Sequence, residues 1–323
     1  MSLFTTQLRQ SIWIGTRKGW HSFIWICKII VPTSLLIALL QWSGLLHRVD
    51  FLLNPLMRLI NLPGEAVLPI IGGLLINLYA AIAIMIVLPF TIKQMTLIAV
   101  FTLIAHNLIV EGIIQQKSGI NIVKILLVRI IVAVLTVLIV SQFLTDTTSS
   151  IVVTSAPAVT PPLVEVLKVW AINTIVLLIK ILLIVTAIMV ALECLQSLGW
   201  TEYLLRFFKP VTRVLGLSDR TALLWVTAVI FGLMYGGAVI MEEARKGTMT
   251  KEELERLHIS IGINHSMVED PALFLVLGLN GFWLWVPKFI MAAVVVQGYR
   301  AFQYLRKESL QRWLVARRLS RKL

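Results

Sequence analysis

Long apolar stretches with few charges constrain this chain more than any other feature. Segments such as 24–43, 119–144 and 165–193 run for about twenty residues or more, long enough to cross roughly 30 Å of hydrocarbon as a helix. Hydrophobic residues make up 58% of the chain, well above the apolar share of a soluble domain. The apolar runs are continuous rather than alternating, which favours helices over a barrel. The sequence therefore predicts an all-α polytopic membrane protein.

Six spans are expected, and two further apolar segments are harder to place. The spans are predicted at 24–43, 66–89, 119–144, 165–193, 222–243 and 282–300. Segments 95–116 and 257–280 are each interrupted near the centre. In the second of them, Pro271 follows two carboxylates and cannot donate a backbone hydrogen bond to an intact helix. Each segment is either a broken transmembrane helix or a re-entrant hairpin.

The second half of the chain is a degenerate copy of the first. Three blocks recur in the same order and at a nearly constant offset: 53–62 as 208–217, 79–85 as 235–241, and 106–111 as 265–270. Repeated halves in a membrane protein usually place a transport pathway at the interface between them.

The repeat predicts a layout of five parts. These are an interfacial amphipathic helix at 1–22, repeat 1 at 23–145, a linker at 146–163, repeat 2 at 164–303 and a basic cytoplasmic tail at 304–323. Each repeat is expected to hold about three transmembrane helices, an interfacial helix (47–62 or 200–217), and a hairpin or broken helix. If 95–116 and 257–280 return to their own side, the halves are inverted and both termini are cytoplasmic, as charge bias favours. Eight full spans would instead make the halves parallel.

The net charge of +13 is concentrated in the tail, which fits anionic lipid headgroups at the cytoplasmic surface and not nucleic acid. The two cysteines suggest neither a disulfide framework nor a metal site. Nucleotide-binding, zinc-protease and serine-hydrolase motifs are absent from the sequence. No cofactor, metal or enzymatic activity is predicted, and the sequence leaves a homo-oligomer open.

Ionisable side chains inside apolar segments are costly, so they are candidates for function. His265 and Glu269 are four residues apart and should share one helix face, whereas the corresponding register in the first half pairs Asn107 with Glu111 and leaves His106 off that face. The candidate substrate-binding residues are His265, Ser266, Glu269, Asp270, Asn107, Glu111, His106, Asn77, Tyr79, Tyr235 and Asn264.

Structural roles remain open for several of these residues. Glu111 and Glu269 can cap hairpin tips or pair with Lys117 or Arg256. The small residues that follow Tyr79 and Tyr235 can serve close helix packing as well as a substrate path. Lys180 interrupts the 165–193 span and can pair with Glu269 or Asp270.

The blocks Tyr235–Glu243 and His265–Pro271, with their first-half copies, resemble the nucleoside-recognition or gate-domain membrane proteins. That family includes spore-maturation membrane proteins and the gate regions of concentrative nucleoside transporters and of ferrous iron transporter B. The resemblance implies a fold with inverted repeats and re-entrant hairpins, a bacterial inner-membrane location and movement of a solute.

We therefore expect a transporter or facilitator of a small polar solute, nucleoside-like or another metabolite, and the sequence leaves open its coupling to protons or another cation. The alternative is a membrane assembly or scaffold protein that binds a partner through the repeat interface, with its polar residues satisfied by one another. An intramembrane enzyme acting on lipid is a weaker third interpretation, because no nucleophile is evident.

Overall fold

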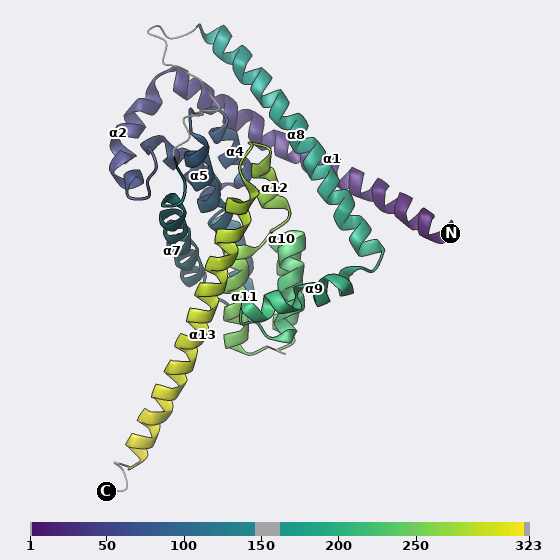
Figure 1. The fold of residues 1–323 in the computed structure, drawn as a ribbon, viewed down its shortest axis with the longest axis vertical. Helices are drawn as coiled ribbons and strands as arrows, with labels where there is room; N and C mark the ends of the chain where they lie inside the picture. The colour runs from purple at the N-terminus through teal and green to yellow at the C-terminus, as the bar shows by residue number, and fades with distance from the viewer. Residues whose placement is uncertain (1, 146–161, 248, 320–323) are drawn as a thin grey trace.

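The computed structural model describes residues 2–145, 162–247 and 249–319, and these residues form helices joined by short turns (Figure 1). The elements are α1 Ser2–Trp42, α2 Leu45–Arg58, the 3-10 turn η1 Gly64–Ala66, α3 Val67–Leu75, α4 Leu78–Met85, α5 Ile92–Ile104, α6 Leu108–Lys117, α7 Ile122–Ser141, α8 Leu163–Ser197, α9 Thr201–Val214, α10 Asp219–Arg245, α11 Lys251–Asn264, α12 Glu269–Leu275 and α13 Gly281–Leu319. The predicted all-α class is confirmed.

Five helical stretches are long and apolar enough to cross a membrane, by length and composition. They are Thr6–Trp42, Ile92–Lys117, Ile122–Ser141, Leu163–Ser197 and Gly281–Arg306. Four of them overlap the spans predicted at 24–43, 119–144, 165–193 and 282–300. Ile122–Ser141 is three residues shorter than predicted at each end, and Thr6–Trp42 begins 18 residues before the predicted start. The fifth, Ile92–Lys117, contains the ambiguous segment 95–116. The chain is therefore a polytopic membrane protein.

The two longest apolar helices of the set, α1 and α8, pack as an antiparallel pair, seen as crossing diagonals in Figure 1. Residues near the start of α1 meet residues near the end of α8: Lys18 Nζ lies 2.5 Å from Glu193 Oε2. Gly15 brings the backbones close, because a Cβ on it would lie 2.5 Å from the Cα of Val190. Small residues permit this kind of approach between helices in lipid.

Two of the predicted domain boundaries fall inside continuous helices. Helix α1 runs from Ser2 to Trp42, so the interfacial helix expected at 1–22 and the first span are one element. Helix α13 continues to Leu319, so the predicted tail at 304–323 begins as its extension. Most of the linker predicted at 146–163 lies outside the described residues. The interfacial helices expected at 47–62 and 200–217 correspond to α2 and α9.

The span predicted at 66–89 is wrong, because this segment is a helical hairpin. Helix α3 ends before Ile76, and Asn77 caps α4 by accepting a hydrogen bond from the Ala80 N–H at 3.0 Å. The two helices pack on each other: a Cβ on Gly72 would lie 2.9 Å from Ile84 Cδ1. Helices of nine and eight residues reach only about 14 and 12 Å, less than half of the hydrocarbon thickness.

The span predicted at 222–243 is also wrong, because α10 doubles back on itself. Gly232 has φ 78° and ψ 165°, a conformation that other residues essentially do not adopt. As a result, Gly236 approaches Ala228 so closely that a Cβ on Gly236 would lie 2.5 Å from the Ala228 Cα. Residues eight apart in a straight helix are about 12 Å apart, so α10 forms a second hairpin around Gly232.

The two segments that the sequence left ambiguous are broken helices. Helices α5 and α6 are separated at 105–107, and α11 and α12 at 265–268, and within the described residues neither pair packs side by side. Helix α5 is buried from Met95 to Ile104, which makes it the centre of the bundle against α3, α7 and α13. The last eight residues of α11 are buried as well. Both breaks therefore lie deep in the protein.

Candidate functional site

Each helix break is marked by a histidine followed by a residue with left-handed backbone. His106 precedes Asn107, at φ 47°, and His265 precedes Ser266, also at φ 47°. Each break is held by a hairpin: Asn107 N–H donates to Gly73 O at 2.9 Å, and Met267 N–H donates to Val229 O at 2.8 Å. Unpaired backbone groups are costly in an apolar interior, so these bonds allow non-helical backbone at this depth.

The two histidine rings face each other across the breaks. Their Nε2 atoms lie 3.2 Å apart, and both rings are almost fully buried. His106 Nδ1 lies 2.9 Å from Thr102 O, and His265 Nδ1 lies 2.7 Å from Ile261 O. A carbonyl oxygen only accepts, so each Nδ1 carries a proton, and a ring in its neutral form presents a lone pair at Nε2.

Two buried carboxylates converge on the same point. Glu111 Oε1 lies 3.1 Å from His265 Nε2 and 3.2 Å from His106 Nε2. Asp270 Oδ2 lies 3.4 Å from His106 Nε2 but accepts no hydrogen bond among the described residues. The carboxylates occupy the first turns of α6 and α12, just after the breaks. Each histidine therefore contacts a carboxylate from the other half of the chain.

Two cations, which the sequence analysis did not single out, complete the site. Arg129 on α7 pairs with Glu111 at 2.7 Å and donates to Ile104 O and His106 O at 2.9 and 2.8 Å. Lys288 on α13 donates to His265 O at 3.2 Å. Each cation thus satisfies carbonyls freed where a helix breaks. A charge in the middle of an apolar span was the signal that could have identified both.

The cations also follow the repeat spacing, because each lies 23 residues after the histidine whose carbonyl it binds. Asn107 and Ser266 likewise occupy equivalent positions, each directly after its histidine. In this alignment of the two halves, Glu111 corresponds to Asp270 and not to Glu269. The expected pairing of His265 with Glu269 along one helix face is not found. His106, which the sequence placed away from the pair in its half, lies at the centre of the site.

The remaining candidate residues have other contacts. Glu269 Oε1 accepts from Tyr79 Oη at 2.9 Å, and Asn77 caps α4. Asn264 is fully buried, and neither of its amide atoms has a hydrogen-bond partner in the described part of the chain. Tyr235 lies on α10, but its side chain is outside the described structure. Glu111 pairs with Arg129 and not with Lys117, and Lys180 is exposed on α8.

A second polar contact, among Lys124, Glu255 and Tyr299, ties together α7, α11 and α13. Tyr299 Oη donates to Glu255, and Lys124 Nζ lies 3.2 Å from the same carboxylate. All of its partners are accounted for, so we assign this contact a structural role.

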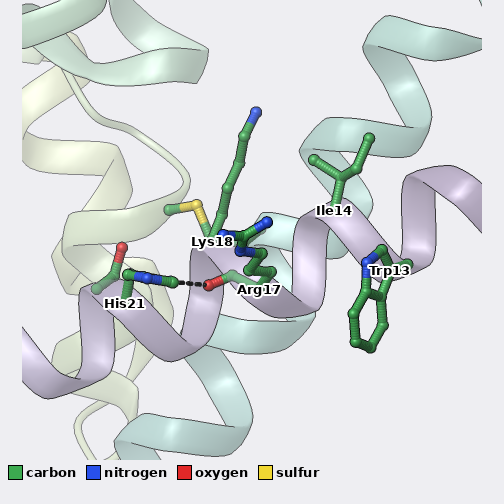
Figure 2. A pocket seen from close by; sticks show the side chains of 7 residues that line it. Trp13, Ile14, Arg17, Lys18 and His21 are labelled. Carbon is green, nitrogen blue, oxygen red and sulfur yellow. Dashed lines mark hydrogen bonds between the residues drawn. The ribbon is translucent and has the colours of Figure 1, made fainter.

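The protein also has an open surface cavity of about 550 Å³, and no residue of the buried cluster lines it. It is lined by residues of α1 and α8: Trp13, Ile14, Arg17, Lys18, His21, Ser22 and Met189. Figure 2 shows His21 turned back onto the carbonyl of Arg17, at 2.7 Å. Cations beside a tryptophan suit the headgroup region of a bilayer. The cavity is therefore a surface feature of the α1–α8 pair and not part of the buried site.

These features define a polytopic helical membrane protein with a buried polar cluster at two helix breaks. Comparison with known proteins agrees: residues 23–153 match the family model of the gate domain, described as nucleoside recognition. The gate-domain resemblance predicted from the sequence is thereby confirmed. The match over these residues suggests a transporter-related role.

One curated relative matches most of the chain. It is an uncharacterized membrane protein, YvoD of Bacillus subtilis (strain 168), which is 29% identical over 272 residues, covering 82% of this chain and 86% of the relative. No solved structure matches. The apolar helices and this relative establish an integral membrane protein.

Proposed function

We propose that the chain is a secondary transporter or facilitator of a small polar solute, with its pathway at the meeting point of the two helix breaks. The observation that carries this proposal is the convergence of His106, His265, Glu111 and Asp270 within an apolar helical bundle. Ionisable groups at membrane depth are costly and characteristically mark substrate or ion pathways. Broken helices expose backbone groups at the same depth, as in known transporter architectures.

Several buried polar atoms favour transport over the scaffold alternative. A scaffold predicts that the polar residues satisfy one another, as Glu111 and Arg129 do. Asn264 and both ring nitrogens of His258, however, are buried without a hydrogen-bond partner in the described structure. Buried polar groups of this kind need a ligand or water to offset their desolvation. A polar solute would satisfy them when it binds.

The arrangement of helices supports inverted halves. If the hairpins at 67–85 and 219–245 each return to the side from which they enter, three crossings remain in each half: α1, α5–α6 and α7, then α8, α11–α12 and α13. An odd number of crossings places the second half upside down relative to the first. Both termini and the basic helix α9 then lie in the cytoplasm, as positive-inside charge bias requires.

A cation bound between the two histidines would couple solute movement to an ion gradient. The unprotonated Nε2 atoms and the oxygens of Glu111 and Asp270 all present negative charge to one point. Without a positive charge these groups repel one another, so occupancy of the point changes how closely the two halves can approach. This links ion binding to the opening and closing of the pathway.

The test is uptake of radiolabelled nucleosides and other polar metabolites into proteoliposomes. We expect saturable uptake of at least one solute class, reduced tenfold or more by Asp270→Asn or Glu111→Gln. Glu242→Gln, at an exposed carboxylate near the end of α10, is the matched control and should leave uptake unchanged. Absence of uptake across the panel, or full uptake by both buried-carboxylate variants, would refute the proposal.

A further inference from the structure

We propose that His106, His265, Glu111 and Asp270 bind one divalent transition-metal ion of the Zn²⁺ or Co²⁺ type. This ion would be the coupling cation of the proposed transporter. Its coupling role rests on the proposed function, whereas its binding does not. Three of these residues offer ligand atoms that all lie within 4.8 Å of one another: His106, His265 and Asp270. Glu111 Oε1 adds a fourth atom, 3.1 Å from His265 Nε2 and 3.2 Å from His106 Nε2.

Four of the distances between these atoms match those of a tetrahedral site. Zinc bonds of about 2.0–2.1 Å at tetrahedral angles place neighbouring ligand atoms roughly 3.3 Å apart. The two histidine Nε2 atoms and Glu111 Oε1 are 3.1–3.2 Å from one another, and Asp270 Oδ2 lies 3.4 Å from His106 Nε2. The ligand atoms of His106, His265 and Asp270 lie within 4.8 Å of one another, so a shift of the Asp270 side chain toward His265 would complete the coordination.

The histidines are already oriented as metal ligands. Each donates its Nδ1–H to a backbone carbonyl, Thr102 O for His106 and Ile261 O for His265, which directs the Nε2 lone pair into the site. Metal-binding histidines characteristically make this second hydrogen bond, because it fixes both the tautomer and the ring plane. The same bonds leave the neutral rings with two lone pairs facing each other, an arrangement that a cation stabilises.

The carboxylates supply anionic oxygen ligands. Glu111 and Asp270 each offer an oxygen to the ion, while Arg129 binds the other oxygen of Glu111 and keeps Oε1 turned toward the rings. Asp270 Oδ2 is buried and accepts no hydrogen bond in the described structure, so it is available as a ligand. Two imidazoles with two carboxylates suit zinc-like ions, whereas magnesium and calcium prefer sites made of oxygen.

A single proton is the competing occupant, and experiment can distinguish the two. One proton placed on either ring would also relieve the repulsion between the lone pairs. It would form a hydrogen bond and produce no metal spectrum and no ligand shell. A bound metal instead excludes that proton, so binding of the ion should release protons and weaken at acidic pH.

The experiment uses the full-length protein in detergent, stripped with chelator and titrated with Co²⁺. We expect one Co²⁺ per chain with the intense visible absorption of tetrahedral cobalt, displaced by Zn²⁺ and not by excess Mg²⁺. X-ray absorption of the zinc form should show imidazole nitrogens at about 2.0–2.1 Å. Absence of stoichiometric, tetrahedral Co²⁺ binding by the wild-type protein would overturn the proposal.

Substitutions of the proposed ligand residues provide a second test of the metal site. His106→Gln, His265→Gln and Asp270→Asn should each weaken Co²⁺ binding at least tenfold, with gel filtration and helicity confirming that the variant is folded. His21→Gln is the matched control, because this imidazole lines the surface cavity of the α1–α8 pair and lies outside the buried cluster. Wild-type affinity in folded His106→Gln and His265→Gln proteins would also overturn the site. Metal binding needs no solute, so the metal-binding test and the solute-uptake test can each fail independently.

Discussion

The Nε2 atoms of His106 and His265 lie 3.2 Å apart, although the residues belong to different halves of the chain. Each histidine ends a broken helix, and each is followed by a residue at φ 47°. Because neither break can move without separating the rings, the contact joins the two halves at the deepest point of the bundle. Under the proposed transport function, the two halves would separate at this contact.

Arg129 should be essential to stability, because its guanidinium pairs with buried Glu111 and also binds two carbonyls of the first break. Arg129→Met removes this cation from a buried carboxylate, a loss of about 3–5 kcal/mol. We expect a markedly lower unfolding temperature in detergent. The double variant Arg129→Met with Glu111→Leu should recover part of the loss, because no charge is then left unpaired. Arg206→Met, at an exposed arginine, serves as the control. Equal stability of Arg129→Met and wild type would show that the pair contributes little.

Gly15 and Gly19 should be required for the packing of α1 on α8. A Cβ on these glycines would lie 2.5 Å from Val190 Cα and 2.8 Å from Thr186 Cα, so alanine must push the backbones apart. We expect Gly15→Ala and Gly19→Ala each to destabilise the protein by about 1–3 kcal/mol. Gly298→Ala, on α13 with no atom near its missing Cβ, should be neutral or slightly stabilising. Denaturant titration in detergent measures all three, and equal effects at the three positions would contradict the close approach.

The hairpin at 67–85 should return to its own side of the membrane. Single cysteines at Leu59 and Pro89, both exposed, are then expected to react with an impermeant thiol reagent from outside the cell. A cysteine at Lys117, beyond the α5–α6 crossing, should react only from the cytoplasm. The native Cys27 and Cys194 are replaced by alanine to remove background. If the cysteines at 59 and 89 react from opposite sides, the segment crosses the membrane as a single span.

Hydropathy predicted the apolar helices well where the helices are regular, as at α7 and α8. It failed at 66–89 and 222–243, because a doubled-back helix and a straight span have nearly the same composition. The break in the first depends on Asn77 as a cap and the break in the second on Gly232 at positive φ. Both residues are visible in the sequence, but isolated asparagines and glycines also occur inside intact transmembrane helices.

The candidate site was predicted in part. The blocks around His106 and His265 were identified because they recur, and the structure brings their histidines together with Glu111 and Asp270. Arg129 and Lys288 were missed, although each is a charge within an apolar span, whereas the exposed Lys180 was singled out. Which face of a helix points inward is decided by tertiary packing, and hydropathy averaged along the chain does not report it.

Gly232 should be irreplaceable, because it forms the turn of the hairpin that supports the second break. At φ 78° and ψ 165°, alanine is strained by about 1–3 kcal/mol, and its Cβ would also lie 3.0 Å from Ser266 Oγ. The hairpin holds this break through the bond from Met267 N–H to Val229 O, so the strain reaches the residues next to His265. We therefore expect Gly232→Ala to lower both the unfolding temperature and the affinity for Co²⁺. Gly247→Asn is the matched control: its φ of 65° lies in the left-handed region that asparagine tolerates, and no atom surrounds its missing Cβ. A Gly232→Ala protein that is as stable as Gly247→Asn and binds Co²⁺ equally well would show that the turn does not position the site.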